Sequence, residues 1–329
     1  MRVASRIIQI CLLLFSAAAA AYADVPSTQV LDAVRGDLSQ GRADHGMQTL
    51  DQVLASDPKN AEAYNLRCRI YLQEQRWNEA VKSCETAVKL APGDSNFHLW
   101  LARAMGEKAD RVSFFTAFKM AKQIHQEFET AARLDPHSAP ALSDLGEFYV
   151  DAPAIVGGGM DKAAGIAQQL DSFAPDRAHY IRARMAEDQK DYARAEDEYK
   201  AAIAANPEPA DAWMDLASFY RHRQRWSDMI DAVHTGAAAD TQRGVALADG
   251  ASVLIRAGRD LPFARQLLEE YLASPNKSED APAFQTHVQL GKLLERLGNP
   301  QGAQQEFAAA QELAKDYQAG TQAATNSGR

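Results

Sequence analysis

The chain has 329 residues, of which 46% are hydrophobic and 24% are charged, so its composition is that of a globular protein. Its three cysteines are too few for a disulfide-rich scaffold or a multi-cysteine zinc protein. The 35 basic and 44 acidic residues give a net charge of −9, which argues against nucleic acid or an anionic membrane as the main partner, because neutralising phosphates needs concentrated Lys and Arg.

Residues 1–23 have the pattern of a secretory signal peptide. Arg2 and Arg6 precede a largely apolar run at residues 7–21, and Ala21-Tyr22-Ala23 then supplies the small residues of a cleavage site. The run is shorter than the roughly 20 apolar residues of a membrane-spanning helix. We therefore expect export across the inner membrane to the periplasm, with no membrane span in the mature chain.

The next feature is a repeat marked by prolines. Pro58, Pro92, Pro136, Pro175 and Pro207 follow one another at spacings of 34, 44, 39 and 32 residues. Each proline follows a helix-like apolar pattern, and proline stops a helix because it lacks an N–H and restricts the preceding residue. A period near 34 predicts a tandem array with two helices per unit.

The unit is clearest at residues 61–94, where a polar turn at Gln75-Arg76 separates two apolar stripes of helical spacing. The stripes consist of Tyr64, Cys68 and Tyr71, then Trp77, Ala80, Cys84, Ala87 and Val88 before Pro92. Other units match: Leu145, Gly146 and Tyr149; Tyr192, Ala195, Tyr199 and Ala202; Trp213, Leu216, Ala217 and Tyr220; Leu290, Gly291, Ala303 and Phe307.

These offsets resemble the tetratricopeptide-repeat (TPR) family over residues 27 to about 315, in about eight units of which the first and seventh are degenerate. The resemblance implies an all-α, right-handed α-solenoid of antiparallel helix pairs, open at its ends, with the first helix of each pair lining a concave face. The expected domains are a signal peptide at 1–23, the solenoid at 24–316, and a flexible C-terminal tail at 317–329.

Two units exceed the period at the turn between their helices, within residues 106–120 of the third repeat and 150–160 of the fourth. Both insertions should emerge on one edge, and inserted segments of repeat proteins often carry the binding face. The apolar residues concerned are Phe114, Phe115, Phe118, Ile155 and Val156. They either extend the local core or form a hydrophobic site. Gly157-Gly158-Gly159 predicts a permissive turn in preference to a phosphate site, because no strand precedes it and no Gly-Lys-Ser/Thr ends it.

The resemblance also implies a groove lined by recurring first-helix positions. One equivalent position in five units holds Arg69, Arg103, Glu147, Arg184 and Arg221, and nearby positions hold Trp100, Asp144, Tyr180 and Asp215. The arginines either bind carboxylates of a partner segment or pair with acidic residues of neighbouring repeats. Asn65 and Arg69 do not reproduce the Lys and Asn clamp of chaperone-binding members, so a C-terminal chaperone motif is not the expected ligand.

Cys68 and Cys84 lie at facing positions of one predicted hairpin, which turns near Arg76. In an oxidising compartment they form either a disulfide or two buried thiols.

A softer joint is expected at residues 234–245, where Gly236 replaces the usual alanine and no proline follows.

The sequence thus favours an exported scaffold that binds a protein or peptide segment on the concave face or the insertion edge. The alternative is a carrier of a small apolar or amphipathic ligand held between the insertions. The eight histidines are scattered and no catalytic, metal or dinucleotide motif is present, so we expect neither an enzyme nor a cofactor.

Overall fold

The computed structural model describes residues 27–327, and every regular element in that range is a helix. The elements are α2 (Ser27–Gln40), α3 (Ala43–Ser56), α4 (Ala61–Gln73), α5 (Trp77–Leu90), α6 (Ser95–Ala109), α7 (Phe114–Leu134), α8 (Ala139–Asp151), the 3-10 helix η1 (Ala154–Val156), α9 (Met160–Leu170), α10 (Pro175–Asp188), α11 (Tyr192–Ala205), α12 (Ala210–His222), α13 (Trp226–Ala239), α14 (Val245–Ala257), α15 (Leu261–Ala273), α16 (Ala283–Arg296), α17 (Pro300–Leu313) and α18 (Gln318–Ser327). The expected signal peptide lies outside the described residues.

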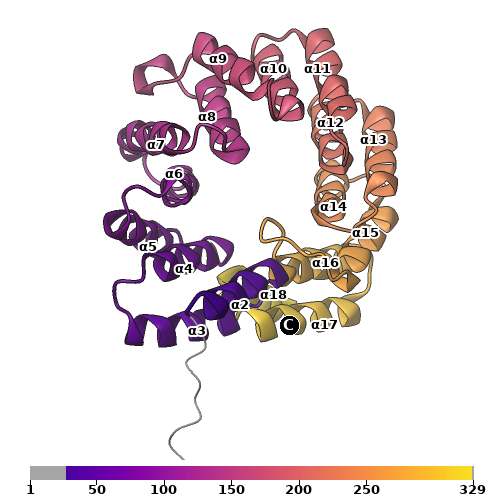
Figure 1. The fold of residues 1–329 in the computed structure, drawn as a ribbon. Helices are drawn as coiled ribbons and strands as arrows, with labels where there is room; N and C mark the ends of the chain where they lie inside the picture. The colour runs from indigo at the N-terminus through magenta and orange to yellow at the C-terminus, as the bar shows by residue number, and fades with distance from the viewer. Residues whose placement is uncertain (1–26, 328–329) are drawn as a thin grey trace, which may run out of the picture.

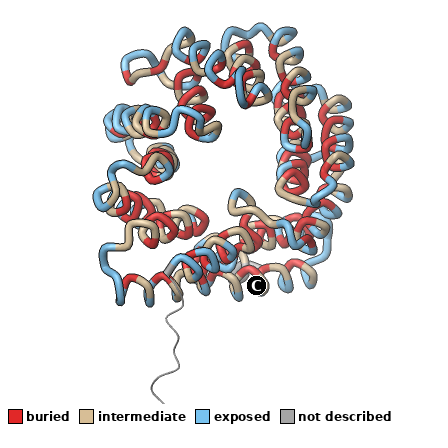
Figure 2. Tube along the Cα trace, in the orientation of Figure 1, coloured by how far each residue is buried: buried red, intermediate tan, exposed pale blue. Residues whose placement is uncertain are grey.

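Consecutive helices pack as eight pairs, from α2 with α3 to α16 with α17, which confirms the α-solenoid and its predicted number of repeats. The first helix of each pair lies on the inner side of the chain and the second on the outer side (Figure 1). Buried residues lie between inner and outer helices all round the molecule instead of in one central core (Figure 2). Each repeat therefore buries its apolar stripes against its partner helix and its neighbours.

Short polar residues start several inner helices. The side chains of Asn60, Asp94 and Ser138 accept hydrogen bonds from backbone N–H groups of the first turns of α4, α6 and α8 at 2.9, 3.1 and 3.3 Å. Such caps satisfy N–H groups that have no partner within the helix. Pro175 differs from the expectation, because it is the first residue of α10 and does not end the preceding helix, which stops at Leu170.

Six repeats place a residue with a left-handed backbone at the same point of the turn between their two helices, and the seventh repeat adds a second one, Asp260. The six residues at that point are Gly41, Gln75, Lys190, Gln224, Gly258 and Gly298, with φ between 57° and 80°. In the third and fourth repeats the inserted segments replace this turn. The left-handed residue therefore marks the register of the repeats directly.

The solenoid closes on itself, whereas the sequence predicted an open coil. One continuous hydrophobic core contains Leu38 and Leu50 of the first repeat together with Phe284 and Phe307 of the last. Gly41 lies so close to Ala283 that an added Cβ would be 2.4 Å from its backbone nitrogen. The turn between α2 and α3 thus meets the start of α16, α3 packs on α17, and the chain forms a ring (Figure 1).

Three further segments bear on the expectations from the sequence. Much of the first insertion is helical, because α7 begins at Phe114 and is 21 residues long. The expected flexible tail begins with α18, which packs on α16 and α17, while Tyr317 just before it is buried. At the expected soft joint, the Asp240 carboxylate accepts the backbone N–H groups of Gln242 and Gly244 at 3.1 and 2.8 Å. These contacts hold the connection in its present conformation, and its softness stays a prediction.

Candidate functional site

The concave face carries a row of arginines from the inner helices. Arg69 of α4 and Arg184 of α10 each lie six residues before the left-handed turn residue of their repeat, as the predicted equivalence requires. In α12 this position is Ser218, and Arg221 lies about one helical turn further along. The predicted equivalence of Arg221 is therefore wrong, because residue types alone do not locate the turn that sets the register of the repeat.

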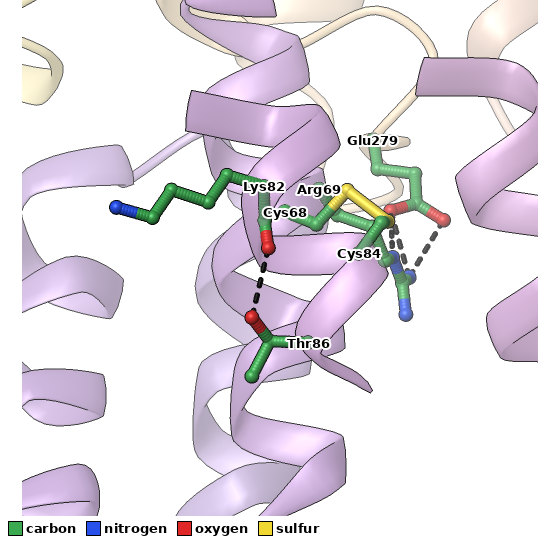
Figure 3. The surroundings of a disulfide bond; sticks show 6 residues. All are labelled: Cys68, Arg69, Lys82, Cys84, Thr86 and Glu279. Carbon is green, nitrogen blue, oxygen red and sulfur yellow. Dashed lines mark hydrogen bonds and ion pairs between the residues drawn. A yellow bond between two sulfur atoms is a disulfide. The ribbon is translucent and has the colours of Figure 1, made fainter. Parts of the chain in front are cut away.

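Arg69 binds a residue more than two hundred positions away. Its Nε and Nη2 atoms donate to both carboxylate oxygens of Glu279 at 2.7 to 2.9 Å (Figure 3). Glu279 belongs to the 274–282 loop, which joins α15 to α16 and extends toward the centre of the ring (Figure 1). The Arg69 side chain is 15% exposed, so the ion pair is largely withdrawn from solvent.

Two guanidinium groups lie over the Trp100 ring. The Cζ atoms of Arg69 and Arg103 are each 4.8 Å from the Trp100 ring centroid, within the range of cation–π attraction. Arg103 also donates to Asp144 of α8 at 2.6 and 3.2 Å. Burial opposes the charge of Arg103, but the bond to Asp144 and the negative charges of Asp144, Asp280 and Glu279 together outweigh it, so the pKa of Arg103 lies above its usual value.

Arg184 is surrounded by acceptors of its own and the preceding repeat. It donates to the Tyr180 hydroxyl at 3.2 Å, to Glu147 at 3.5 Å and to Asp151 at 3.0 and 3.1 Å. Burial and the nearby Glu147 raise the pKa of Tyr180, which keeps its hydroxyl protonated. The concave arginines Arg103 and Arg184 thus pair with acidic residues of neighbouring repeats, the second alternative of the sequence analysis.

An acidic surface lies across the ring from Arg69. Burial raises the pKa of Asp215 on α12 to about 7, and Asp211 and Asp249 add repulsion, while Arg177 acts in the opposite direction. Burial likewise raises the pKa of Asp249 on α14 to about 6. The interior of the ring is therefore basic and aromatic near α4 and α6 and acidic near α12 and α14.

Two adjoining pockets of about 490 and 530 Å³ open at the basic end, and both are lined by Arg69, Trp100, Arg103 and Glu279. A third, of about 480 Å³, is lined by Tyr180, Arg184 and Asp215. The structure thus gathers most predicted groove residues around three pockets. Arg221 lines none of them; its Nη2 contacts the His222 ring at 2.6 Å, and its Nε has no hydrogen-bond partner in residues 27–327.

Sequence reasoning missed Glu279 and its neighbour Asp280. A detectable signal was the length of the 274–282 loop, which carries two consecutive acidic residues and is longer than the other connections between repeats.

At the insertion edge, η1 packs against α7, so the two insertions meet. Val156 is buried, and Phe118 is partly covered by Lys122, whose Nζ lies 5.4 Å from its ring centroid. Phe114, Phe115 and Ile155 are 77%, 84% and 72% exposed. The insertions therefore extend the core only in part and leave three large apolar side chains on the surface.

The three glycines before α9 are explained by packing. Gly157 has φ of 117°, and a Cβ on it would lie 2.4 Å from the His125 ring. A Cβ on Gly158 would lie 1.7 Å from the backbone oxygen of Ala152. The run is thus a tight turn against α7 and α8, in line with the preferred interpretation of the sequence.

Cys68 on α4 and Cys84 on α5 are joined by a disulfide in the structure, with Cα atoms 5.3 Å apart (Figure 3). Both cysteines are fully buried, and Cys68 directly precedes Arg69. The bond therefore fixes the two helices beside the basic pockets.

Within residues 27–327, no three His, Cys, Asp or Glu side chains cluster in a way that would hold a metal ion. In the same range, no helix combines the length and the apolar character needed to cross a membrane.

Sequence models described as tetratricopeptide repeats match residues 37–104, 161–208, 180–240 and 284–317, which together exceed half of the chain. A curated relative, the tetratricopeptide repeat and J domain-containing co-chaperone DNJ1 of Fusarium oxysporum f. sp. lycopersici, is 27% identical over 130 residues. The match covers 38% of this chain and 25% of the relative, so the chain spans about a quarter of that protein's length.

Two solved structures are similar in fold. TTC0263, a thermophilic TPR protein of Thermus thermophilus, shares 20% identity with a TM-score of 0.50, over 59% of this chain and 98% of that one. Yeast Tom70 shares 15% identity with a TM-score of 0.54, over 94% of this chain and 65% of that one. At these identities the similarity concerns the fold alone.

Proposed function

Because the chain belongs to the tetratricopeptide-repeat family, whose members bind protein partners, we propose that it is a scaffold that holds a partner segment on its concave face. The observation that carries the proposal is the pair of adjoining pockets around Arg69, Trp100 and Arg103. These groups are held by inner helices and by one another, so a partner meets a preformed surface and loses little affinity to ordering it.

We also propose that the protein acts outside the cytoplasm, most directly in the periplasm. The signal-peptide pattern of residues 1–23 supports this location. A disulfide between Cys68 and Cys84 is in keeping with it, because such bonds persist in oxidising compartments. The TPR fold typically serves as a non-catalytic scaffold, and the proposed mechanism is equilibrium binding alone.

The competing surface is the insertion edge. Its exposed Phe114, Phe115 and Ile155 favour contact with a partner over enclosure of a small ligand, because none of the pockets described above is lined by them. We therefore retain the edge as a second candidate for protein binding.

Charge reversal separates the two surfaces. The protein is mildly crosslinked to partners in the envelope fraction, and the amount of crosslinked product is compared among variants whose melting temperature equals that of the wild type. Arg103→Glu with Arg184→Glu should abolish the product, whereas the same change on outer helices, Arg194→Glu with Arg265→Glu, should not. If the concave variant retains the product and Phe114→Ala with Phe118→Ala loses it, the binding surface is the insertion edge and our assignment is wrong.

A further inference from the structure

The 274–282 loop occupies the basic end of the concave face. Besides the Arg69–Glu279 pair, the backbone oxygen of Glu279 accepts a hydrogen bond from Gln73 Nε2 at 3.1 Å. Glu279 and Asp280 both line the larger pocket with Arg69 and Arg103. A loop of the seventh and eighth repeats thus fills part of the surface formed by the second and third.

The loop is fastened mainly at its base. The Tyr271 hydroxyl accepts the backbone N–H of Ser278 at 2.8 Å and donates to the backbone oxygen of Ala281 at 2.7 Å. Asn276 Nδ2 donates to the backbone oxygen of Gln242 at 2.8 Å. The first two bonds hold the loop to α15 and the third holds it to the 240–244 connection, while Gln40 of α2 donates to the backbone oxygen of Pro275 at 2.8 Å. Within the groove, the loop contacts α4 through the carboxylate of Glu279 and through the bond from Gln73 to its backbone oxygen.

Arg69 has no substitute for that carboxylate. Arg103 is already paired with Asp144, whereas in the described part of the chain Glu279 is the one acidic residue paired with Arg69. Removing one partner of a buried ion pair leaves an uncompensated charge. A guanidinium group in this position therefore favours another carboxylate, which it can bind through two parallel hydrogen bonds.

We propose that the groove of Arg69, Trp100 and Arg103 binds an acidic segment of a partner protein, and that Glu279 and Asp280 occupy it as an internal competitor. The proposal rests on the function proposed above and specifies its ligand. The partner places a carboxylate where Glu279 lies, on Arg69 beside Trp100, and its neighbouring residues extend into the two adjoining pockets.

Internal competition has a measurable consequence. A group tethered by a short segment competes at an effective concentration of about 1 mM. The apparent dissociation constant of an outside ligand is its intrinsic constant divided by the fraction of molecules whose groove is free of the loop. Neutralising the loop should therefore strengthen the binding of an acidic peptide to the same groove.

The test uses the full chain and a fluorescein-labelled peptide with the sequence of residues 274–282, SPNKSEDAP, measured by fluorescence anisotropy. Glu279→Gln with Asp280→Asn should bind the peptide at least about tenfold more tightly than the wild type, because the competitor is gone. Adding Arg69→Gln should abolish this gain, and a peptide with Gln and Asn in place of its Glu and Asp should not bind. The control is the same loss of charge on α15, Glu269→Gln with Glu270→Gln, which should bind like the wild type.

A second measurement covers the case in which the loop variant does not fold. In the wild type, saturating peptide should speed amide exchange in residues 274–282 and leave α13 unchanged. Unchanged loop exchange at saturation, or a folded loop variant that binds no more tightly than the wild type, would overturn the proposal. If one of these two outcomes occurs while partners still crosslink through the concave face, the scaffold function stands and only the acidic ligand is wrong. If the concave face also fails to crosslink to partners, the proposed function is rejected as well.

Discussion

At the scale of single residues, the concave arginines differ in what neutralises them. Arg103 and Arg184 pair with acidic residues of adjacent repeats, while the partner of Arg69 comes from the loop between the seventh and eighth repeats. Repeat offsets place all three on the concave face, so this part of the site was predictable from the sequence. Glu279 was not, because no repeat pattern relates it to Arg69.

The disulfide gives a prediction at this scale. Closing the segment between Cys68 and Cys84, which are 16 residues apart, stabilises the fold by about 3 kcal/mol on the chain-entropy model. We expect neither cysteine to react with a thiol reagent in unreduced, denatured protein, and a reductant to lower the free energy of unfolding by about that amount. Cys84→Ser should remove the response to reductant. Two reactive thiols in peptide mapping of Cys68 and Cys84 would show that the bond is absent in solution.

Gly236 gives a second prediction at the scale of single residues. A Cβ there would lie 2.6 Å from Cβ of Trp213 and 2.8 Å from Cε of Met214, so the glycine permits close packing of α13 on α12. Gly236→Ala should therefore lower the free energy of unfolding despite the higher helix propensity of alanine. Gly165→Ala in α9, where nothing lies within 4 Å, should raise it by about 0.5 to 1 kcal/mol.

Urea unfolding of both variants provides the comparison. Stabilisation by Gly236→Ala, together with amide exchange faster at 234–245 than in neighbouring turns, would support the soft joint that the sequence predicts.

At the scale of elements, the sequence predicts helix pairs well and their irregularities poorly. Periodic apolar residues and polar turns determine pairs such as α4 and α5, since each stripe has one face to bury. The segment from Phe114 to Met120 exceeds the repeat length, which predicts an insertion between helices. It extends α7 instead, because a surplus over the period shows where residues are added and not which backbone they adopt.

This extension leads to a third prediction. The ring centroids of Phe114 and Phe115 are 5.8 Å apart, and both side chains are otherwise exposed. Phe128 in the same helix is only 8% exposed. Phe114→Ser with Phe115→Ser should change the free energy of unfolding by no more than about 0.5 kcal/mol, as for other surface positions. Phe128→Ala should cost about 3 to 5 kcal/mol in the same urea titration. A large loss from the surface pair would mean that the first turns of α7 are packed in solution.

At the scale of the whole molecule, the closed ring is the feature that repeat patterns did not indicate. Each repeat contacts its neighbours, and the small rotation per repeat that decides where the chain ends is set by packing details. The contacts of Gly41 with Ala283 and of Arg76 with Asp316 appear only after that rotation has accumulated round the molecule.

The closed ring leads to a fourth prediction, which concerns how the free energy of unfolding depends on pH. Burial raises the pKa of Glu74 to about 7 from 4.5, Arg76 lowers it, and Asp316 of the opposite end raises it. The folded chain thus binds this proton more tightly than the unfolded chain, so the free energy of unfolding should fall as pH rises from about 4.5 to about 7, and this contribution should then level off. Asp215 and Asp249 contribute with the same sign.

Urea unfolding between pH 5 and 8 measures the slope. Glu74→Gln should reduce it, whereas Glu79→Gln, which removes the other acidic partner of Arg76 within the second repeat, should leave it in place. An undiminished slope in Glu74→Gln would assign the pH dependence to other carboxyl groups.

The distance between the first and last repeats tests the closed ring most directly. Gln48 on α3 and Glu312 on α17 line the same pocket and are both exposed. Spin labels at Gln48→Cys and Glu312→Cys, with Cys11 replaced by serine and the Cys68–Cys84 bond intact, should give a single short distance by electron–electron double resonance. A broad distribution centred several tens of ångströms away, as in an open coil of helices each about 10 Å thick, would contradict the closed ring.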